Sequence, residues 1–120
     1  MIKLITLLTR KVGLTREAFI EHYETHHRKI GEKYLGGYAA KYQRRYIRVA
    51  ESANHAPVEL PFDVLMEIWF PDQARMDEAM ALIASESAQV EINADEARLF
   101  ERDKTRSYVV EEYESDMPTL

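Results

Sequence analysis

Apolar residues follow two different spacings along the chain. Residues 2–9 form a short apolar run and residues 62–70 alternate strictly, and both patterns predict β-strands. Residues 38–49 and 105–113 predict two further strands. Between the strands, apolar side chains recur every three or four residues, as they do in helices that pack one face on a core. The predicted order of elements is therefore βαββαβ.

Two helices have clear start signals. The first predicted helix begins with Thr15 as its N-cap and ends at Gly36-Gly37. Its apolar side chains share one sector of the helix, and they are Phe19, Ile20, Tyr23, Ile30 and Tyr34. The second helix follows Asp72 as its cap and carries apolar residues at helical spacing, namely Met76, Ala79, Met80 and Ile83. A short helical turn is expected near residues 93–100, with Asp95-Glu96 interpreted as its cap.

Side-chain parity assigns faces to the strands. In residues 62–70, one face is apolar and predicted to be core, and it comprises Val64, Met66, Ile68 and Phe70. The opposite face is mixed and comprises Asp63, Leu65, Glu67 and Trp69. In residues 38–49, Ile47 and Val49 share one face. The other face of that strand is aromatic and cationic, and it comprises Tyr42, Arg44, Tyr46 and Arg48.

The βαββαβ order predicts the ferredoxin-like fold of the α+β class, in which an antiparallel sheet carries its helices on one face. The other face would then be bare. We expect that bare face to expose an apolar patch, and its members are Tyr42, Tyr46, Leu65 and Trp69. A second copy of the chain would cover the patch, so the pattern predicts a homodimer that closes a barrel and encloses a cavity.

Composition narrows the classes of protein. The 120 residues fit one domain over 1–120, and no apolar run approaches the roughly 18 residues that cross a bilayer, so we expect a cytoplasmic protein without a membrane role. The absence of cysteine excludes disulfides, thiolate catalysis and cysteine zinc sites. A net charge of −5 argues against nucleic acid as the main partner. Residues 50–61 are polar with two prolines and predict a long loop that could cover a site.

The segment FIEHYETHH, residues 19–27, places three histidines in one predicted helix. On a regular α-helix, His27 and His26 point inward and His22 lies at the edge of the apolar stripe. His22 and His26 have the i, i+4 spacing of metal ligands, but the zinc motif needs a glutamate directly after the first histidine. A third ligand is also missing nearby, so we expect no metal site.

An inward His27 has two interpretations. It could act as a general acid/base, oriented by the carboxylate of Asp63, Glu67 or Asp95. It could instead hydrogen-bond a backbone carbonyl and close the core. The aromatic and cationic face of residues 38–49 is similarly divided, because it could line a cavity for an anionic or phenolic ligand or form a dimer contact.

Three segments, in this order, resemble the EthD family of the dimeric α+β barrel superfamily. They are R-K-V-G-L-T-R-E-A-F-x-x-H-Y-x-x-x-H over residues 10–27, F-D-V-L-M-E-I-W-F over 62–70 and A-D-E-A-R-L-F-x-x-D over 94–103. The resemblance implies a ferredoxin-like homodimer with a pocket between sheet and helices. It also implies that His27 occupies the family position most often associated with chemistry, with Tyr23 as the aromatic residue four positions before it.

Together these features lead to one main hypothesis. The chain would be a small homodimeric enzyme that binds a hydrophobic, oxygenated molecule of aromatic, lactone or polyketide-like type. It would transfer protons without a cofactor. The resemblance to the EthD family implies an oxidoreductase, and an isomerase or cyclase is also compatible. His27 would be the acid/base and Asp63 would position its ring. The substrate-binding set would be Tyr23, Arg44, Tyr46, Arg48 and Trp69.

A second hypothesis is a non-catalytic protein that binds a metabolite or serves as an accessory in a degradation or redox pathway. Haem binding is a third and lesser option, because the superfamily that the chain resembles includes haem users and a pocket histidine can ligate iron.

Overall fold

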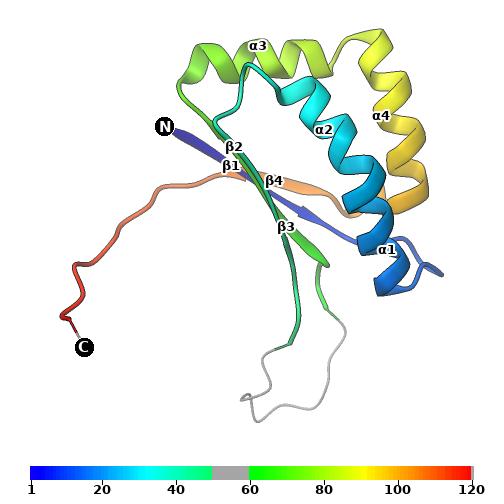
Figure 1. Cartoon of the computed structure of the whole chain (residues 1–120), viewed down its shortest axis with the longest axis horizontal. Coiled ribbons are helices and arrows are strands. Elements are labelled where there is room, and N and C mark those ends of the chain that lie inside the picture. The colour runs from blue at the N-terminus through cyan, green and yellow to red at the C-terminus, as the bar shows by residue number, and fades with distance from the viewer. Residues whose placement is uncertain (50–59, 120) are drawn as a thin grey trace.

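The computed structural model describes residues 1–49 and 60–119, and its centre is a four-stranded antiparallel sheet (Figure 1). The strand order is β2-β3-β1-β4. The strands are β1 (Ile2–Leu8), β2 (Lys41–Tyr46), β3 (Val64–Phe70) and β4 (Arg106–Val109). The two central strands, β1 and β3, pair over their whole length from Ile2 opposite Phe70 to Leu8 opposite Val64. The predicted α+β class and ferredoxin-like order are confirmed.

The helices lie together on one side of the sheet (Figure 1). The first helical segment is continuous and consists of α1 (Arg16–His22), a π-helical turn η1 (Tyr23–His27) and α2 (Arg28–Leu35). After β3 come α3 (Gln73–Ile83), α4 (Glu86–Leu99) and the short 3₁₀ turn η2 (Arg102–Lys104). Within residues 1–49 and 60–119, no helix has the length and apolar character needed to span a membrane.

The predicted helix starts are confirmed by their caps. The Thr15 hydroxyl accepts a hydrogen bond from the Ala18 N–H, and the Asp72 carboxylate accepts one from the Arg75 N–H. Each side chain thereby satisfies a donor that the first helical turn leaves without an intrahelical partner. At the other end, the helical segment stops before Gly36, as predicted.

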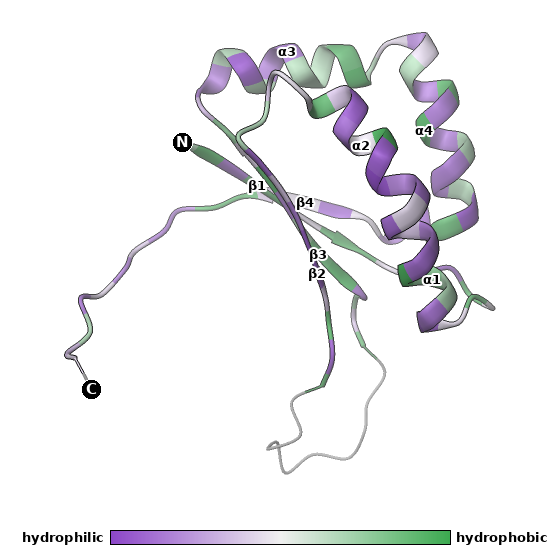
Figure 2. Ribbon diagram, viewed as in Figure 1, coloured by the Kyte–Doolittle hydropathy of each residue, from purple (hydrophilic) through white to green (hydrophobic). Residues whose placement is uncertain are grey.

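The core lies between the sheet and the helices. Val64, Ile68 and Phe70 of β3 are buried there, with Met66 packed against them, so the predicted core face of this strand is confirmed. In Figure 2, green residues are frequent along β1 and β3, whereas much of α2 is purple. Burial of such apolar area contributes about 25 cal/mol per Å², which makes this layer the main source of stability.

The prediction that the tyrosines of β2 lie on the bare face of the sheet is wrong. Tyr42 pairs with Ile68, and Tyr46 pairs with Val64. Residues directly opposite each other in a sheet point to the same face. Tyr42 and Tyr46 therefore lie under the helices, and they do not belong to the bare face. Leu65 and Trp69 do lie on the bare face, together with Ile5, Leu7 and Tyr108, and with a rim of charged groups that includes Lys3, Lys41, Arg45 and Glu67.

Several predicted boundaries also need correction. The second strand covers Lys41–Tyr46 rather than residues 38–49, and the last covers Arg106–Val109 rather than 105–113. The predicted short turn near residues 93–100 is part of the 14-residue helix α4, which begins after Ser85. Apolar residues are sparse along α4, so the helical spacing of apolar positions was too weak in the sequence to predict the whole helix. The predicted loop over residues 50–61 lies mostly outside the described residues.

Gly31 of α2 allows the helix to approach the sheet closely. A Cβ atom at this position would lie 2.8 Å from Cε2 and Oη of the Tyr42 ring. We expect Gly31→Ala to lower the free energy of unfolding by about 1–3 kcal/mol, as overpacking does elsewhere, although alanine is the better helix former. Urea denaturation measures the change.

The matched background for that change is Tyr42→Ala, which removes the ring. There Gly31→Ala should be neutral or stabilising, because only its helix propensity remains. A stabilising effect of Gly31→Ala in the unaltered chain would show that the Tyr42 ring does not restrict this position.

Candidate active site

The π-helical turn η1 sets the directions of the histidines. The N–H of Arg28 donates to the carbonyl of Tyr23, five residues earlier, so one turn here contains an additional residue. Residues five apart, such as His22 and His27, then lie one above the other, whereas in a regular α-helix they would point to different sides. The turn therefore presents two imidazoles to the same neighbour.

That neighbour is Asp95 of α4, which is 3% exposed. One carboxylate oxygen lies 2.7 Å from Nε2 of His22 and the other lies 2.7 Å from Nδ1 of His27. Nε2 of His26 is farther away, at 3.6 Å from the first oxygen. A buried carboxylate needs such partners, and here two ring nitrogens supply them.

These contacts fix the proton positions of the pair. Burial alone would raise the pKa of Asp95, but the hydrogen bonds from His22 and His27 outweigh it and hold that pKa below its usual value. An ionised carboxylate only accepts hydrogen bonds, so Nδ1 of His27 must donate. In a neutral imidazole, Nε2 then carries the lone pair and can accept a proton.

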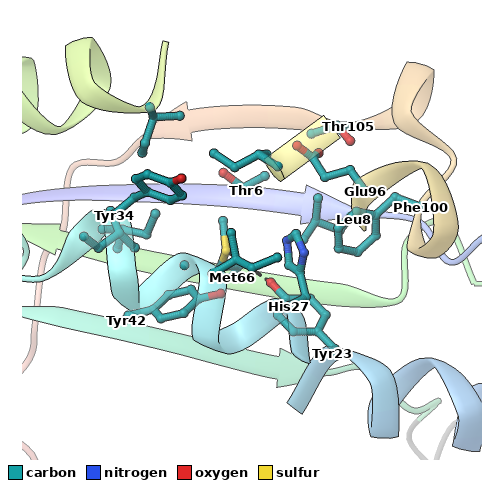
Figure 3. A pocket seen from close by; sticks show the side chains of 16 residues that line it. Thr6, Leu8, Tyr23, His27, Tyr34, Tyr42, Met66, Glu96, Phe100 and Thr105 are labelled. Atoms are coloured by element: carbon teal, nitrogen blue, oxygen red, sulfur yellow. Dashed lines mark hydrogen bonds between the residues drawn. The ribbon is translucent and has the colours of Figure 1, made fainter. Parts of the chain in front are cut away.

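The His27 ring is held by aromatic neighbours on two sides. Its centroid lies 5.1 Å from that of Tyr23 and 5.3 Å from that of Phe100, both edge to face. The side chain is 13% exposed and lines a cavity between the helices and the sheet (Figure 3). The imidazole is thus fixed on one nitrogen and adjoins a cavity that can admit a small molecule.

The cavity has a volume of about 170 Å³ and is mainly apolar. Its walls come from β1, β2, β3, the helical segment and α4, and Figure 3 shows the side chains that surround it. Apolar lining residues include Leu8, Ile30, Met66, Ile68, Ile92 and Phe100. A few polar groups interrupt them, namely Thr6, Tyr34, Tyr42, Glu96 and Thr105. Apolar cavities with few polar groups are typical binding sites for small organic molecules.

Two of these polar groups are unusual. Burial raises the pKa of Glu96 above its usual value, and the nearby His27 and Arg102 only partly offset this effect. The Oγ1 atom of Thr105 is buried without a hydrogen-bond partner among the residues that the structure describes. The hydroxyl of Thr105 therefore has unused capacity to bind a polar atom of a ligand.

Two positions assigned from the sequence need correction. His26 was expected to point inward, but its side chain is 58% exposed, whereas His22, which was expected at the edge, is half-buried and reaches Asp95. Asp63 was expected to position His27. Its carboxylate instead accepts a hydrogen bond from the N–H of Arg10 at 2.7 Å, and Asp95 takes its place at His27.

The predicted substrate-binding residues are dispersed. Tyr23 lines the cavity, and its hydroxyl donates to the sulfur of Met66 at 3.3 Å. Arg44 is bound by both oxygens of Glu24, at 2.8 and 2.9 Å, and Tyr46 donates to the same carboxylate. The hydrogen bonds from Arg44 hold the pKa of Glu24 below its usual value, so this ion pair does not offer a free cation to a ligand.

The remaining two predicted residues lie away from the cavity. Arg48 is exposed just after β2. Trp69 lies on the bare face of the sheet, where the Lys3 ammonium stacks 3.8 Å and the Lys41 ammonium 4.1 Å from a ring centroid. Neither residue is among those that line the cavity of His27.

Sequence reasoning missed Glu96, Thr105 and Tyr34 as cavity residues. Asp95 was named as a candidate partner of His27, yet a helix cap was the preferred interpretation of Asp95-Glu96. The sequence signal that could have identified Glu96 is the acidic pair Asp95-Glu96 in the middle of a segment compatible with a helix. In the described part of the chain, no group of three or more acidic, histidine or cysteine side chains is arranged to hold a metal ion.

A family model described as the EthD domain matches residues 11–103. A comparison with curated proteins found no match. Among solved structures, an ethyl tert-butyl ether d (EthD) family protein from Bacillus halodurans C-125 has a TM-score of 0.64 at 19% identity, over 94% of this chain and 99% of that one.

Two other structures are similar in fold. A protein from Arabidopsis thaliana has a TM-score of 0.61 at 14% identity, over 98% of this chain and 100% of that one. An antibiotic biosynthesis monooxygenase has a TM-score of 0.54 at 17% identity, over 95% of this chain and 100% of that one. At these identities the likeness shows a shared fold.

Asp95→Asn tests the histidine pair. A carboxamide cannot accept from both imidazoles in the same geometry, so we expect a loss of about 1–3 kcal/mol in the free energy of unfolding. The lowered pKa of Asp95 stabilises the fold above the pKa of an unfolded aspartate, about 3.9, and this stabilisation is lost as the pH falls through the lower folded value. Urea denaturation of both proteins should therefore show a difference at neutral pH that shrinks in acid.

Glu86→Gln is the control for that comparison, because Glu86 is an exposed acid on the same helix. It should change stability only slightly at any pH. A difference between Asp95→Asn and the unaltered chain that stays constant into strong acid would contradict an ionised Asp95 clamped by the histidines.

Proposed function

Because this chain belongs to the EthD family, whose model matches residues 11–103, we propose that it is an enzyme that transfers protons on a hydrophobic, oxygenated small molecule. His27 is the general base of this reaction. Asp95 is the residue that positions His27, in the role first assigned to Asp63. The reaction that we propose needs no cofactor.

The observation that carries the proposal is the pairing of Nδ1 of His27 with Asp95 at 2.7 Å beside an apolar cavity. The pair leaves one ring nitrogen with a lone pair, and the ionised Asp95 stabilises the imidazolium that forms when this nitrogen takes a proton. Exclusion of water by the apolar walls strengthens this electrostatic effect. Such an arrangement suits removal of a proton from a weak carbon or oxygen acid.

The walls indicate the chemical class of the substrate. An apolar lining around a few hydroxyl and carboxyl groups favours an aromatic, lactone or polyketide-like molecule with a carbonyl or phenol oxygen. Isomerisation, cyclisation and oxygen-dependent oxidation of an activated aromatic can each begin with removal of a proton next to a carbonyl. The oxidoreductase label therefore remains compatible with this first step.

The bare face of the sheet supports a homodimer. Ile5, Leu7, Leu65 and Trp69 point away from the helices, and a partner's sheet would remove these side chains from water. The charged rim around them could pair across a twofold axis, because both copies would present the same surface. In the proposed enzyme, this dimer is the stable unit.

His27→Asn tests the proposed base. The probe is 2-tetralone, an uncharged aromatic ketone, and the reaction is exchange of its α-hydrogens with deuterium in D₂O, followed by proton NMR. We expect the protein to accelerate exchange and His27→Asn to lower the rate by at least about 100-fold, since general bases typically contribute 10² to 10⁴. His26→Asn is the matched control, because this side chain is exposed and one position away, and it should retain the rate.

Equal rates for the protein and for buffer would contradict an enzyme that acts on such ketones and would favour a binding or accessory protein. Equal rates for the unaltered chain and His27→Asn would contradict His27 as the base.

Ile5→Glu tests the dimer. A buried glutamate at the centre of the proposed interface should abolish association, because its charge would lose water without gaining a partner. Analytical ultracentrifugation should give twice the mass of one 14.0 kDa chain for the unaltered protein and a single chain for Ile5→Glu. Val90→Glu is the control, since Val90 is 69% exposed on α4. A monomeric unaltered chain would contradict the dimer.

A further inference from the structure

The cavity of His27 contains a second acid. Glu96 follows Asp95 directly in α4, so one helix supplies the carboxylate that holds His27 and another carboxyl group in the cavity wall. Asp95 is fully committed to two histidines, whereas Glu96 is among the side chains that line the cavity, as is Thr105 (Figure 3). The two neighbouring acids therefore have different surroundings and can have different roles.

A hydroxyl group in the same wall lacks a partner. Within the described residues, Oγ1 of Thr105 is buried and makes no hydrogen bond. Burial without a hydrogen bond is unfavourable for a hydroxyl, because the group has given up its bonds to water and gained none. A ligand oxygen that reached this position would satisfy the hydroxyl. Thr105 thus marks the place where an oxygen atom fits.

The charges of the wall restrict the ligand. Within the described residues, those that line the cavity include no lysine and no arginine. An anionic group would lose its water in an apolar space and would find no lysine or arginine among the described lining residues to pair with, and both effects are unfavourable. An uncharged molecule has neither penalty. The cavity therefore favours a neutral carbonyl compound over a carboxylate.

We propose that Glu96 is the general acid that works opposite His27, with Thr105 as a hydrogen-bond donor to the same substrate oxygen, on an uncharged ketone or lactone. This inference rests on the proposed function of His27 as a base. It adds Glu96 as a second catalytic residue and specifies that the substrate is uncharged.

The proposed step is an enolisation that balances without a redox partner. Nε2 of His27 takes the proton from the carbon next to the carbonyl, and that C–H electron pair forms a C=C bond. The carbonyl π pair moves to oxygen, which takes the proton of the Glu96 carboxylic acid. The products are the enol, a Glu96 carboxylate and a His27 imidazolium paired with Asp95. Return of the protons to the original carbon gives exchange, and return to a conjugated carbon gives an isomer.

Burial supports the role of Glu96 as an acid, against most of the charges around it. His27 from η1 and Arg102 from η2 favour its ionised form, and Asp95 on its own helix disfavours it. Arg102 is also engaged by the side-chain oxygen of Asn93 at 2.7 Å. Burial dominates, so Glu96 keeps its proton to a higher pH than an exposed glutamate does. A general acid is effective only while it holds that proton.

Glu96→Gln tests the inference in the 2-tetralone exchange assay. Glutamine keeps the size and a hydrogen-bond donor but cannot transfer a proton, so we expect kcat/KM to fall by at least about 30-fold, within the range of general-acid effects. In the unaltered protein, kcat/KM should also decline as the pH rises through the pKa of Glu96. This alkaline decline should be absent in Glu96→Gln, which a purely structural role of Glu96 would not produce.

Binding of two planar molecules tests the charge class without turnover. 2-Naphthol mimics the enol of 2-tetralone and is uncharged at neutral pH, whereas 2-naphthoate has a similar ring system and an anionic carboxylate. We expect 2-naphthol to bind at least ten times more tightly, and Thr105→Val to weaken its binding. Glu86→Gln is the control in both assays, because Glu86 is exposed at the start of α4.

The outcomes separate the two proposals. Loss of exchange in His27→Asn together with an unchanged rate and pH profile in Glu96→Gln would overturn Glu96 as the acid and leave His27 as the base. Equal or tighter binding of 2-naphthoate would overturn the uncharged substrate class. A chain that accelerates no exchange would overturn the proposed function, and with it the enolisation step.

Discussion

The burial of one carboxylate organises the functional half of this molecule. Asp95 is almost fully removed from water, and an ionised group in that position is tolerated only where hydrogen-bond donors converge on it. The π turn supplies those donors by aligning His22 and His27. Helix α4 is thereby joined to the first helical segment at the same point where the His27 ring meets the cavity. The packing of α4 on the first helical segment and the orientation of the His27 ring thus depend on the same contact.

The second organising constraint is the register between β2 and β3. It places Tyr42 and Tyr46 under the helices, where Tyr42 packs against Gly31 and Tyr46 against Phe19. Arg44 enters the same layer and is neutralised by Glu24 of the π turn. Arg44 and Glu24 pair with each other and are not among the residues that line the cavity, which leaves His27 and Glu96 as its main acid–base groups.

The sequence predicted those features that depend on neighbours in the chain. Thr15 and Asp72 were identified as caps because a capping side chain acts within three residues. Alternation in residues 62–70 identified the core face of β3. The face of β2 could not be predicted, because alternation defines two faces and only pairing with β3 decides which one meets the helices. The direction of His26 was predicted wrongly because the helical wheel assumes 3.6 residues per turn, whereas the π turn includes an additional residue. Asp63 was preferred over Asp95 as the partner of His27, because the packing that brings α4 to the histidines cannot be read from neighbours in the chain.

The hydrogen bond between His27 and Asp95 also has a consequence for the order of folding. It joins residues 68 positions apart, and Thr105 of the cavity wall lies farther still along the chain. During synthesis the histidines emerge before α4, so the imidazoles are present before the carboxylate that orients them. Contacts of such separation form only after the loop between them has closed. A chain that lacks α4 therefore contains the base without the carboxylate that orients it.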